Sequence, residues 1–154
     1  APKSFVIRVS IRPGCYRDIQ ISGENTLDQF SSVILDSFDF FNYHNHAFFM
    51  DDEPWSDVNC YYRTGGVNDA PLTTETTLNQ AGLALNQNFL YIFDFGDEWR
   101  FECTVLRVLD DNTDHPIEIE RHGTPPEQYG DPDDYEDEYE GDEEFYENQR
   151  TRNN

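Results

Sequence analysis

Two histidines and a scattered set of carboxylates are the residues best suited to carry chemistry in this chain. His44 and His46 lie two positions apart in the stretch "YHNHAFF", and side chains at that spacing on a strand point to the same face. Imidazole and carboxylate groups are common metal ligands. The candidate metal ligands are therefore His44, His46 and Asp97, with Asp94 and Glu127 as further carboxylates that the fold would have to bring close. Hydrogen-bonded packing is the alternative role for the two histidines.

The stretch "FDFGDEWRFE", residues 93 to 102, contains Asp94-Phe95-Gly96, a string that holds magnesium in protein kinases. The Gly-rich phosphate loop, the strand lysine and the HRD-type catalytic loop of kinases are missing from the sequence. Gly96-Asp97 instead separates two strand-like runs, and glycine at the first central position favours a two-residue type II′ turn. We therefore interpret Asp94 and Gly96 as structural turn residues.

Other catalytic chemistry finds little support in the sequence. No serine or cysteine has a recognisable base partner for nucleophilic catalysis. Cys15, Cys60 and Cys103 are odd in number, far apart and without a CxxC pair. This pattern disfavours a disulfide framework or a zinc site and predicts buried, reduced thiols. The residues favour a non-enzymatic protein over an enzyme, and we expect no cofactor.

Hydrophobic periodicity predicts a single small α+β domain with a largely antiparallel sheet. Apolar residues alternate in "SFVIRVSIR" and "CYRDIQIS" on either side of Pro13-Gly14, which predicts a hairpin. Thr26 and Gln29 form a capping-box pattern ahead of one main amphipathic helix over residues 27–38, and residues 77–82 predict a short second helix. Further strands are expected in the stretches "HNHAFFM", "NFLYIFDF", "EWRFECTVLRVL" and "PIEIE".

The expected turn at Gly96-Asp97 determines which side chains of its hairpin share a face. A two-residue turn pairs Asp94 with Trp99 and Ile92 with Phe101, and cross-strand partners lie on the same face. The face that carries Ile92 and Phe101 is predicted to join the core. The opposite face mixes aromatic side chains with charged ones, as a partner-facing surface would. Its candidate partner-contact residues are Tyr91, Phe93 and Phe95.

Residues 131–154 form an acidic, low-complexity tail that we separate from a domain at residues 1–130. The tail has 11 acidic residues and 2 arginines, a net charge of −9, and residues 1–130 carry −13 of the total of −22. Such a self-repelling segment is not expected to fold alone. Its aromatic side chains are candidate anchors for a basic partner, and a purely solubilising tail is the alternative. These anchors are Tyr135, Tyr139, Phe145 and Tyr146.

The negative charge limits the partners that the chain can bind. It repels nucleic acid phosphates, which disfavours direct nucleic acid binding, and it favours a basic protein surface. An acid-rich, lysine-poor composition also fits a high-salt cytoplasm as an alternative origin of the charge. No apolar run approaches the roughly 18 residues needed to span a membrane. The opening "APKS" leads directly into a strand pattern and does not resemble a secretory signal, so we expect a cytoplasmic protein, with a processed secreted form as the alternative.

Several stretches together resemble the plasmid pRiA4b ORF-3-like family. They are "CYRDIQI", "TLDQF", "HNHAF", "FLYIFDFGDEW" and "PPEQYG", in the family's order over about residues 4–130, with the acidic tail outside the pattern. The resemblance implies a small α+β domain of poorly understood function. Its family-like polar positions are His44, His46, Asp94, Asp97 and Glu127. Members often have a histidine where this chain has Phe101, and that departure weakens the case for a shared catalytic or metal site.

These observations lead to one main hypothesis and two alternatives. The main hypothesis is a non-enzymatic acidic interaction module that binds a basic protein partner through its negative surface, its aromatic sheet face and its tail, with nucleic-acid mimicry as one version. The first alternative is a metal-binding or metal-dependent hydrolase-like protein that uses the histidines and carboxylates named above. The second alternative is a structural protein that self-associates through the aromatic face.

Overall fold

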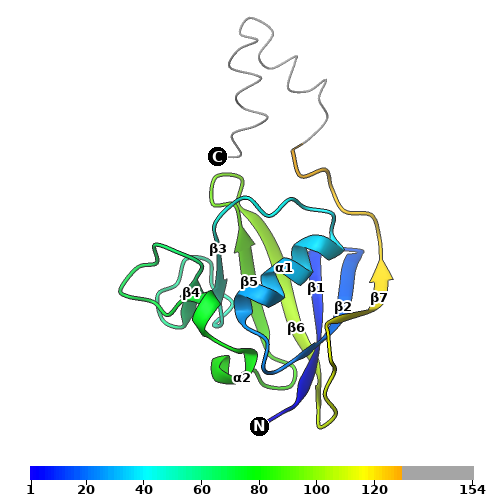
Figure 1. Ribbon diagram of the computed structural model, residues 1–154. Coiled ribbons are helices and arrows are strands. Elements are labelled where there is room, and N and C mark those ends of the chain that lie inside the picture. The colour runs from blue at the N-terminus through cyan, green and yellow to red at the C-terminus, as the bar shows by residue number, and fades with distance from the viewer. Residues whose placement is uncertain (130–154) are drawn as a thin grey trace, which may run out of the picture.

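Seven strands form one antiparallel sheet in the order β4-β3-β5-β6-β1-β2-β7 (Figure 1). The computed structural model describes residues 1–129, so the predictions for residues 131–154 lie outside the described residues. The strands are β1 (Ser4–Arg12), β2 (Cys15–Ser22), β3 (His46–Phe49), β4 (Cys60–Tyr62), β5 (Asn88–Phe93), β6 (Trp99–Leu109) and β7 (Ile117–His122). The helices are α1 (Leu27–Ser37), α2 (Leu78–Ala81) and the 3₁₀ turn η1 (Thr73–Glu75). This architecture confirms the predicted α+β domain with one main and one short second helix.

Helix α1 forms where the capping pattern and the apolar spacing predicted it. The Gln29 amide donates to the Thr26 hydroxyl at 3.1 Å, and the Gln29 side chain accepts from the Thr26 amide at 2.9 Å. These bonds satisfy amides that the first turn of a helix leaves without partners. The same box starts α2 at Thr77, and Gly82 ends α2 in the left-handed conformation at φ 73°. The buried stripe of α1 comprises Leu27, Phe30, Ile34 and Leu35.

The sheet separates two apolar clusters. The larger one lies between α1 and the sheet face that α1 crosses, and it includes Phe48, Phe89, Tyr91, Phe93 and Phe101. The smaller one lies on the opposite face under the long connections around β4, and it includes Ala47, Phe49, Leu90 and Ile92. All three cysteines are buried and free, as predicted. Within residues 1–129, no helix is long and apolar enough to cross a membrane.

The β5–β6 hairpin corrects the predicted register by one residue. Phe93 pairs with Trp99 and Tyr91 with Phe101, so the connection has five residues instead of two. Asp94 and Glu98 both adopt positive φ, 65° and 53°, and the Glu98 amide donates to the Asp94 carbonyl. A shift of one residue exchanges the two faces of a strand. Tyr91 and Phe93, which were assigned to a partner surface, therefore face α1.

Arg17 is a fully buried cation that joins β2 to α1 and β7. Its guanidinium donates to the carbonyl oxygens of Tyr16, Ser37, His122 and Gly123 at 2.8 to 3.2 Å. The Ser37 carbonyl belongs to the last turn of α1, where the helix dipole is negative and favours a cation. The guanidinium also lies 4.8 Å from the centre of the Phe38 ring. One side chain thus fixes the position of α1 relative to the edge of the sheet.

Candidate functional site

Three segments that are distant in the sequence meet at one end of the sheet. They are the connection from α1 to β3, the β5–β6 loop and residues 124–129. The Asp94 amide donates to the Asn45 carbonyl at 2.9 Å. Gln128 accepts from the Phe41 amide at 2.7 Å and donates to the Phe41 carbonyl at 3.1 Å. These bonds hold the connection between α1 and β3 at Phe41 and at Asn45.

His44 is the centre of a small polar cluster in this region. Its Nε2 lies 3.4 Å from Asp94 Oδ2 and 3.1 Å from the Tyr129 hydroxyl. The His44 and Asp94 side chains are only 3% and 1% exposed. With a proton on Nε2, the imidazole donates toward the carboxylate, and the paired groups hold each other in a defined orientation. Phe93 packs against His44 with the ring centres 5.6 Å apart.

Asp97 completes the cluster at the surface. Its backbone amide donates to Asp94 Oδ1 at 3.3 Å, a contact within the β5–β6 loop. Burial raises the pKa of Asp97, the nearby Asp94 charge raises it further, and His44 opposes both effects. The sequence interpretation thus named three of the grouped residues, His44, Asp94 and Asp97. It missed Tyr129, although "PPEQYG" is one of the stretches that carry the family resemblance.

His46 lies in a different environment, which corrects the prediction that both histidines share a face. Strand β3 begins at His46, so the two-residue periodicity of a strand does not extend to His44. His46 is buried, with Nδ1 3.2 Å from the Ser31 hydroxyl and Nε2 2.9 Å from the Thr73 hydroxyl. Ser31 also bonds the buried Tyr91 hydroxyl. Burial, and secondarily the charge of Arg63, lowers the pKa of His46 to about 3.

The proposed metal ligands are therefore not brought together as a set. Glu127 is exposed, and the ring nitrogens of His46 are both engaged in hydrogen bonds. Among residues 1–129, no group of three or more histidine, cysteine, aspartate or glutamate side chains is arranged to hold a metal ion. What the cluster offers is a buried histidine–carboxylate pair with a tyrosine hydroxyl and a surface carboxyl of raised pKa.

The structure also corrects the position of the aromatic residues that were predicted to contact a partner. Tyr91 and Phe93 are fully buried, so assigning them to a partner surface was wrong. Phe95 is half-buried, with its ring packed edge-on against Trp55 and Tyr62 at 5.0 and 6.0 Å between ring centres. The other predicted contacts lie outside the described residues. They are Tyr135, Tyr139, Phe145 and Tyr146.

Phe41 and Tyr43 are exposed aromatic residues that the sequence interpretation overlooked. They are 59% and 69% exposed. Their rings stack nearly parallel, 5.8 Å apart. The signal in the sequence was their alternation in a short stretch between the end of a helix and the start of a strand. We call these two residues the aromatic pair.

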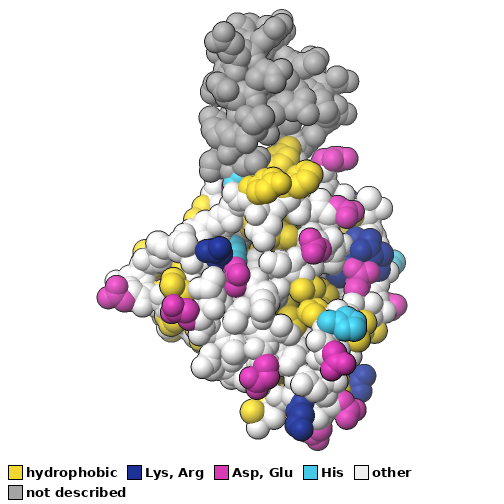
Figure 2. Space-filling view, viewed as in Figure 1, with side chains coloured by type: hydrophobic (Ala, Val, Ile, Leu, Met, Phe, Trp, Pro, Cys, Tyr) yellow, Lys and Arg dark blue, Asp and Glu magenta, His cyan; other side chains and the backbone are white. Residues whose placement is uncertain are grey.

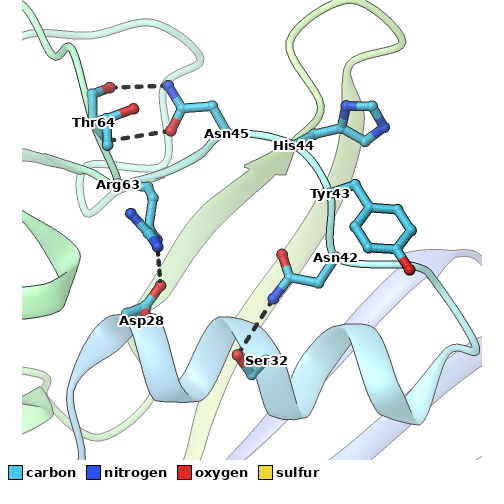
Figure 3. Close-up of a pocket in the computed structure, with 8 residues that line it drawn as sticks. All are labelled: Asp28, Ser32, Asn42, Tyr43, His44, Asn45, Arg63 and Thr64. Carbon is cyan, nitrogen blue, oxygen red and sulfur yellow. Dashed lines mark hydrogen bonds and ion pairs between the residues drawn. The ribbon is translucent and has the colours of Figure 1, made fainter. Parts of the chain in front are cut away.

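A polar pocket of about 520 Å³ adjoins the aromatic pair (Figure 3). It lies between the first half of α1, the connection from α1 to β3 and the end of β4. Arg63 and Asp28 form an ion pair on its wall, with Arg63 Nε 3.1 Å from Asp28 Oδ1. The lining residues are Asp28, Ser32, Asn42, Tyr43, His44, Asn45, Arg63 and Thr64.

The model for the plasmid pRiA4b ORF-3-like protein family matches residues 4–152. The chain belongs to the plasmid pRiA4b ORF-3-like family. Its fold is similar to the crystal structure of MM3350, a protein of unknown function from Methanosarcina mazei Go1. That comparison has a TM-score of 0.66 and 25% sequence identity, and it covers 93% of this chain and 83% of that chain. A search of curated proteins found no match.

The extent of the pRiA4b ORF-3-like match corrects one sequence expectation. The resemblance was expected to end near residue 130, but the match continues through the acidic tail to residue 152. A boundary between two units near residue 130 stays a prediction. The stretches that carry the resemblance also supply the polar cluster: "HNHAF" contains His44, "FLYIFDFGDEW" contains Asp94 and Asp97, and "PPEQYG" contains Tyr129.

Proposed function

We propose that this chain is a non-enzymatic acidic interaction module that binds a basic protein partner, with the aromatic pair as its anchor. The observation that carries the proposal is the exposure of a stacked Phe41–Tyr43 pair on a surface with a large excess of negative charge. Exposed aromatic side chains are frequent anchors of protein interfaces. The acidic tail, with its four interleaved aromatic residues, is proposed as a second element of the same interface.

The basic side chains of the domain do little to offset its acidic surface. Of 32 acidic and 10 basic residues, 11 and 2 lie in residues 131–154, which leaves 21 and 8 in the rest of the chain. Four arginines are paired with carboxylates of the domain, and Arg17 is buried. This leaves seventeen carboxylates outside these ion pairs and only three further basic residues, Lys3, Arg12 and Arg107. Figure 2 displays the resulting excess of acidic side chains on one face of the molecule.

The proposal predicts salt-sensitive binding that depends on the aromatic pair. A blocked lysine- and arginine-rich peptide should bind the full-length chain, and raising the salt from about 50 to 300 mM should weaken binding because the charges are screened. Replacing both Phe41 and Tyr43 with alanine should raise the Kd about tenfold, as expected for anchor residues. Isothermal titration calorimetry measures both effects.

A matched control uses two apolar residues that are exposed elsewhere. Val58 and Leu85 are 80% and 56% exposed, and replacing both with alanine should leave the Kd unchanged. Equal weakening by the two double variants would contradict a specific role of the aromatic pair. The contribution of the tail is measured in the full chain by replacing its aromatic residues with serine. These residues are Tyr135, Tyr139, Phe145 and Tyr146.

The polar cluster supports a second candidate, a metal-binding or hydrolase-like protein. The favouring observation is that His44, Asp94 and Asp97 converge from separate family stretches. Metal bound to the native protein and lost in the His44→Ala variant would favour this candidate, and elemental analysis measures it. Salt-sensitive peptide binding that survives the same substitution would favour the interaction module. Size-exclusion chromatography over a concentration series tests the third option, self-association.

A further inference from the structure

The connection between α1 and β3 is held at Phe41 and at Asn45, and no contact within residues 1–129 uses the backbone groups between them. Phe41 is fixed by Gln128 through both its N–H and its C=O, and the Asn45 carbonyl accepts from the Asp94 amide. Between these points, the backbone N–H and C=O groups of residues 42–44 make no hydrogen bond to other groups within residues 1–129. A segment positioned in this way offers backbone donors and acceptors to another chain with little further loss of conformational freedom.

The adjoining pocket adds side-chain acceptors that suit a cation. Arg63 Nε lies 3.1 Å and His46 Nε2 lies 3.9 Å from Asp28 Oδ1, so within residues 1–129 both contacts of this carboxylate are to Oδ1 and not to Oδ2. Asn42 uses its amide nitrogen to donate to the Ser32 hydroxyl at 3.4 Å, which leaves its amide oxygen as an acceptor. In Figure 3 this oxygen points away from α1, toward the space between the lining residues. A carboxylate can accept from two cations at once, so Arg63 does not exhaust Asp28.

Tyr43 is one of the lining residues, and in Figure 3 its ring points away from Asp28 and Arg63. Its ring is largely exposed and stacks on Phe41. The excess of carboxylates on the domain attracts a cationic group and repels an anionic one.

We propose that this pocket receives a lysine or arginine side chain from a peptide segment of the partner. The segment forms backbone hydrogen bonds with residues 42–44, and its cationic group binds Asp28 Oδ2 and the Asn42 amide oxygen. This inference rests on the proposed function and deepens it, because it assigns a site and a chemical class to the partner's contact. It assigns to Arg63 the role of holding the Asp28 carboxylate in place.

The test compares blocked glycine peptides that carry one central arginine, lysine or glutamine, titrated into the ¹⁵N-labelled full-length protein. The arginine and lysine peptides should shift the amide signals of residues 42–45 and of Thr64, and the glutamine peptide should not. Asp28→Asn should weaken binding of the arginine peptide about threefold to tenfold, as expected for a partly exposed charge pair. Asn42→Ala should weaken it as well, without changing any charge.

The control variant is Glu98→Gln. Glu98 also pairs with an arginine, Arg100, but it does not line the pocket. Glu98→Gln removes one negative charge, as Asp28→Asn does. Equal effects of these two variants on peptide binding would therefore overturn the pocket assignment. Thermal melting of each variant identifies any loss of fold, and Asn42→Ala keeps the test decisive if Asp28→Asn is unstable.

The outcomes separate this inference from the proposed function. If the lysine- and arginine-rich peptide binds and needs the aromatic pair, but both pocket variants bind it like the native chain, the pocket assignment fails and the proposed function stands. If that peptide does not bind the native chain at all, the proposed function fails, and this inference fails with it. Shifts confined to residues 42–45 and Thr64, lost in both pocket variants and kept in Glu98→Gln, support the inference.

Discussion

Replacing Arg17 with methionine should lower the free energy of unfolding by about 3 to 5 kcal/mol. Methionine fills much of the same volume, so the expected loss comes from the hydrogen bonds and not from a cavity. Four carbonyl oxygens, from two strands, the end of α1 and residue 123, would lose their common donor. The bond to the Ser37 carbonyl is buried and the other three are partly buried, and a buried acceptor without a partner costs about 1 to 3 kcal/mol when water cannot reach it. Urea unfolding monitored by circular dichroism measures the change.

Arg121 provides the control for this prediction. It also donates to the Ser37 carbonyl, at 3.2 Å, but its side chain is half exposed and paired with Glu118. Arg121→Met should therefore cost less than about 1 kcal/mol. Arg17→Lys should fall between the native chain and Arg17→Met, because one ammonium cannot span four acceptors from a single position. Equal stability of the Arg17→Met and Arg121→Met variants would show that the buried guanidinium does not hold α1 to the sheet edge.

Acidification should lower the free energy of unfolding because His46 is buried as a neutral side chain. The folded-state pKa of His46 is lowered to about 3, whereas an unfolded chain has a histidine pKa of about 6.5. Below pH 6.5 the unfolded state binds a proton that the folded state does not accept until the pH approaches 3. The free energy of unfolding should therefore fall as the pH drops through this window, by about 3 kcal/mol between pH 7 and pH 4 from this residue alone.

A His46→Gln variant isolates that effect. Glutamine keeps a donor and an acceptor for the Ser31 and Thr73 hydroxyls but has no charge to gain. The many carboxylates contribute their own pH dependence to both proteins, so the difference between the two unfolding curves reports His46. We expect the variant to be less stable at pH 7, because the packing is imperfect, and to lose less stability on acidification. Parallel pH profiles for the native chain and the variant would refute the assignment.

The hairpin between β5 and β6 illustrates which features of the fold the local sequence pattern could predict. Both strands were predicted from their apolar runs, and the turn residues Asp94 and Gly96 lie in the connection. The register was wrong because Asp94 and Glu98 adopt left-handed backbone conformations in a five-residue loop. Glycine followed by aspartate favours a two-residue turn. The bond from the Asp94 amide to the Asn45 carbonyl is a contact with a distant segment, which the local sequence does not predict.

The histidines show the same limit for the site. A spacing of two predicts a shared face only inside a strand, and β3 begins at His46, so His44 lies outside it. The partners of His44 come from the β5–β6 loop and from residue 129, and those of His46 come from α1 and η1. These long-range contacts decide that one histidine joins a polar cluster at the end of the sheet and the other is buried in the core.

The sequence by itself determined the α+β class, the capped helices, most strands, the family and the strong negative charge. Each of these follows from periodicity, capping chemistry or composition, which act over a few residues or over the chain as a whole. Tertiary structure alone decided which aromatic side chains are exposed, which carboxylate meets which histidine, and that a lone arginine is buried among carbonyl oxygens. Those outcomes depend on register and on contacts between segments up to about a hundred residues apart, and a one-residue shift reverses them.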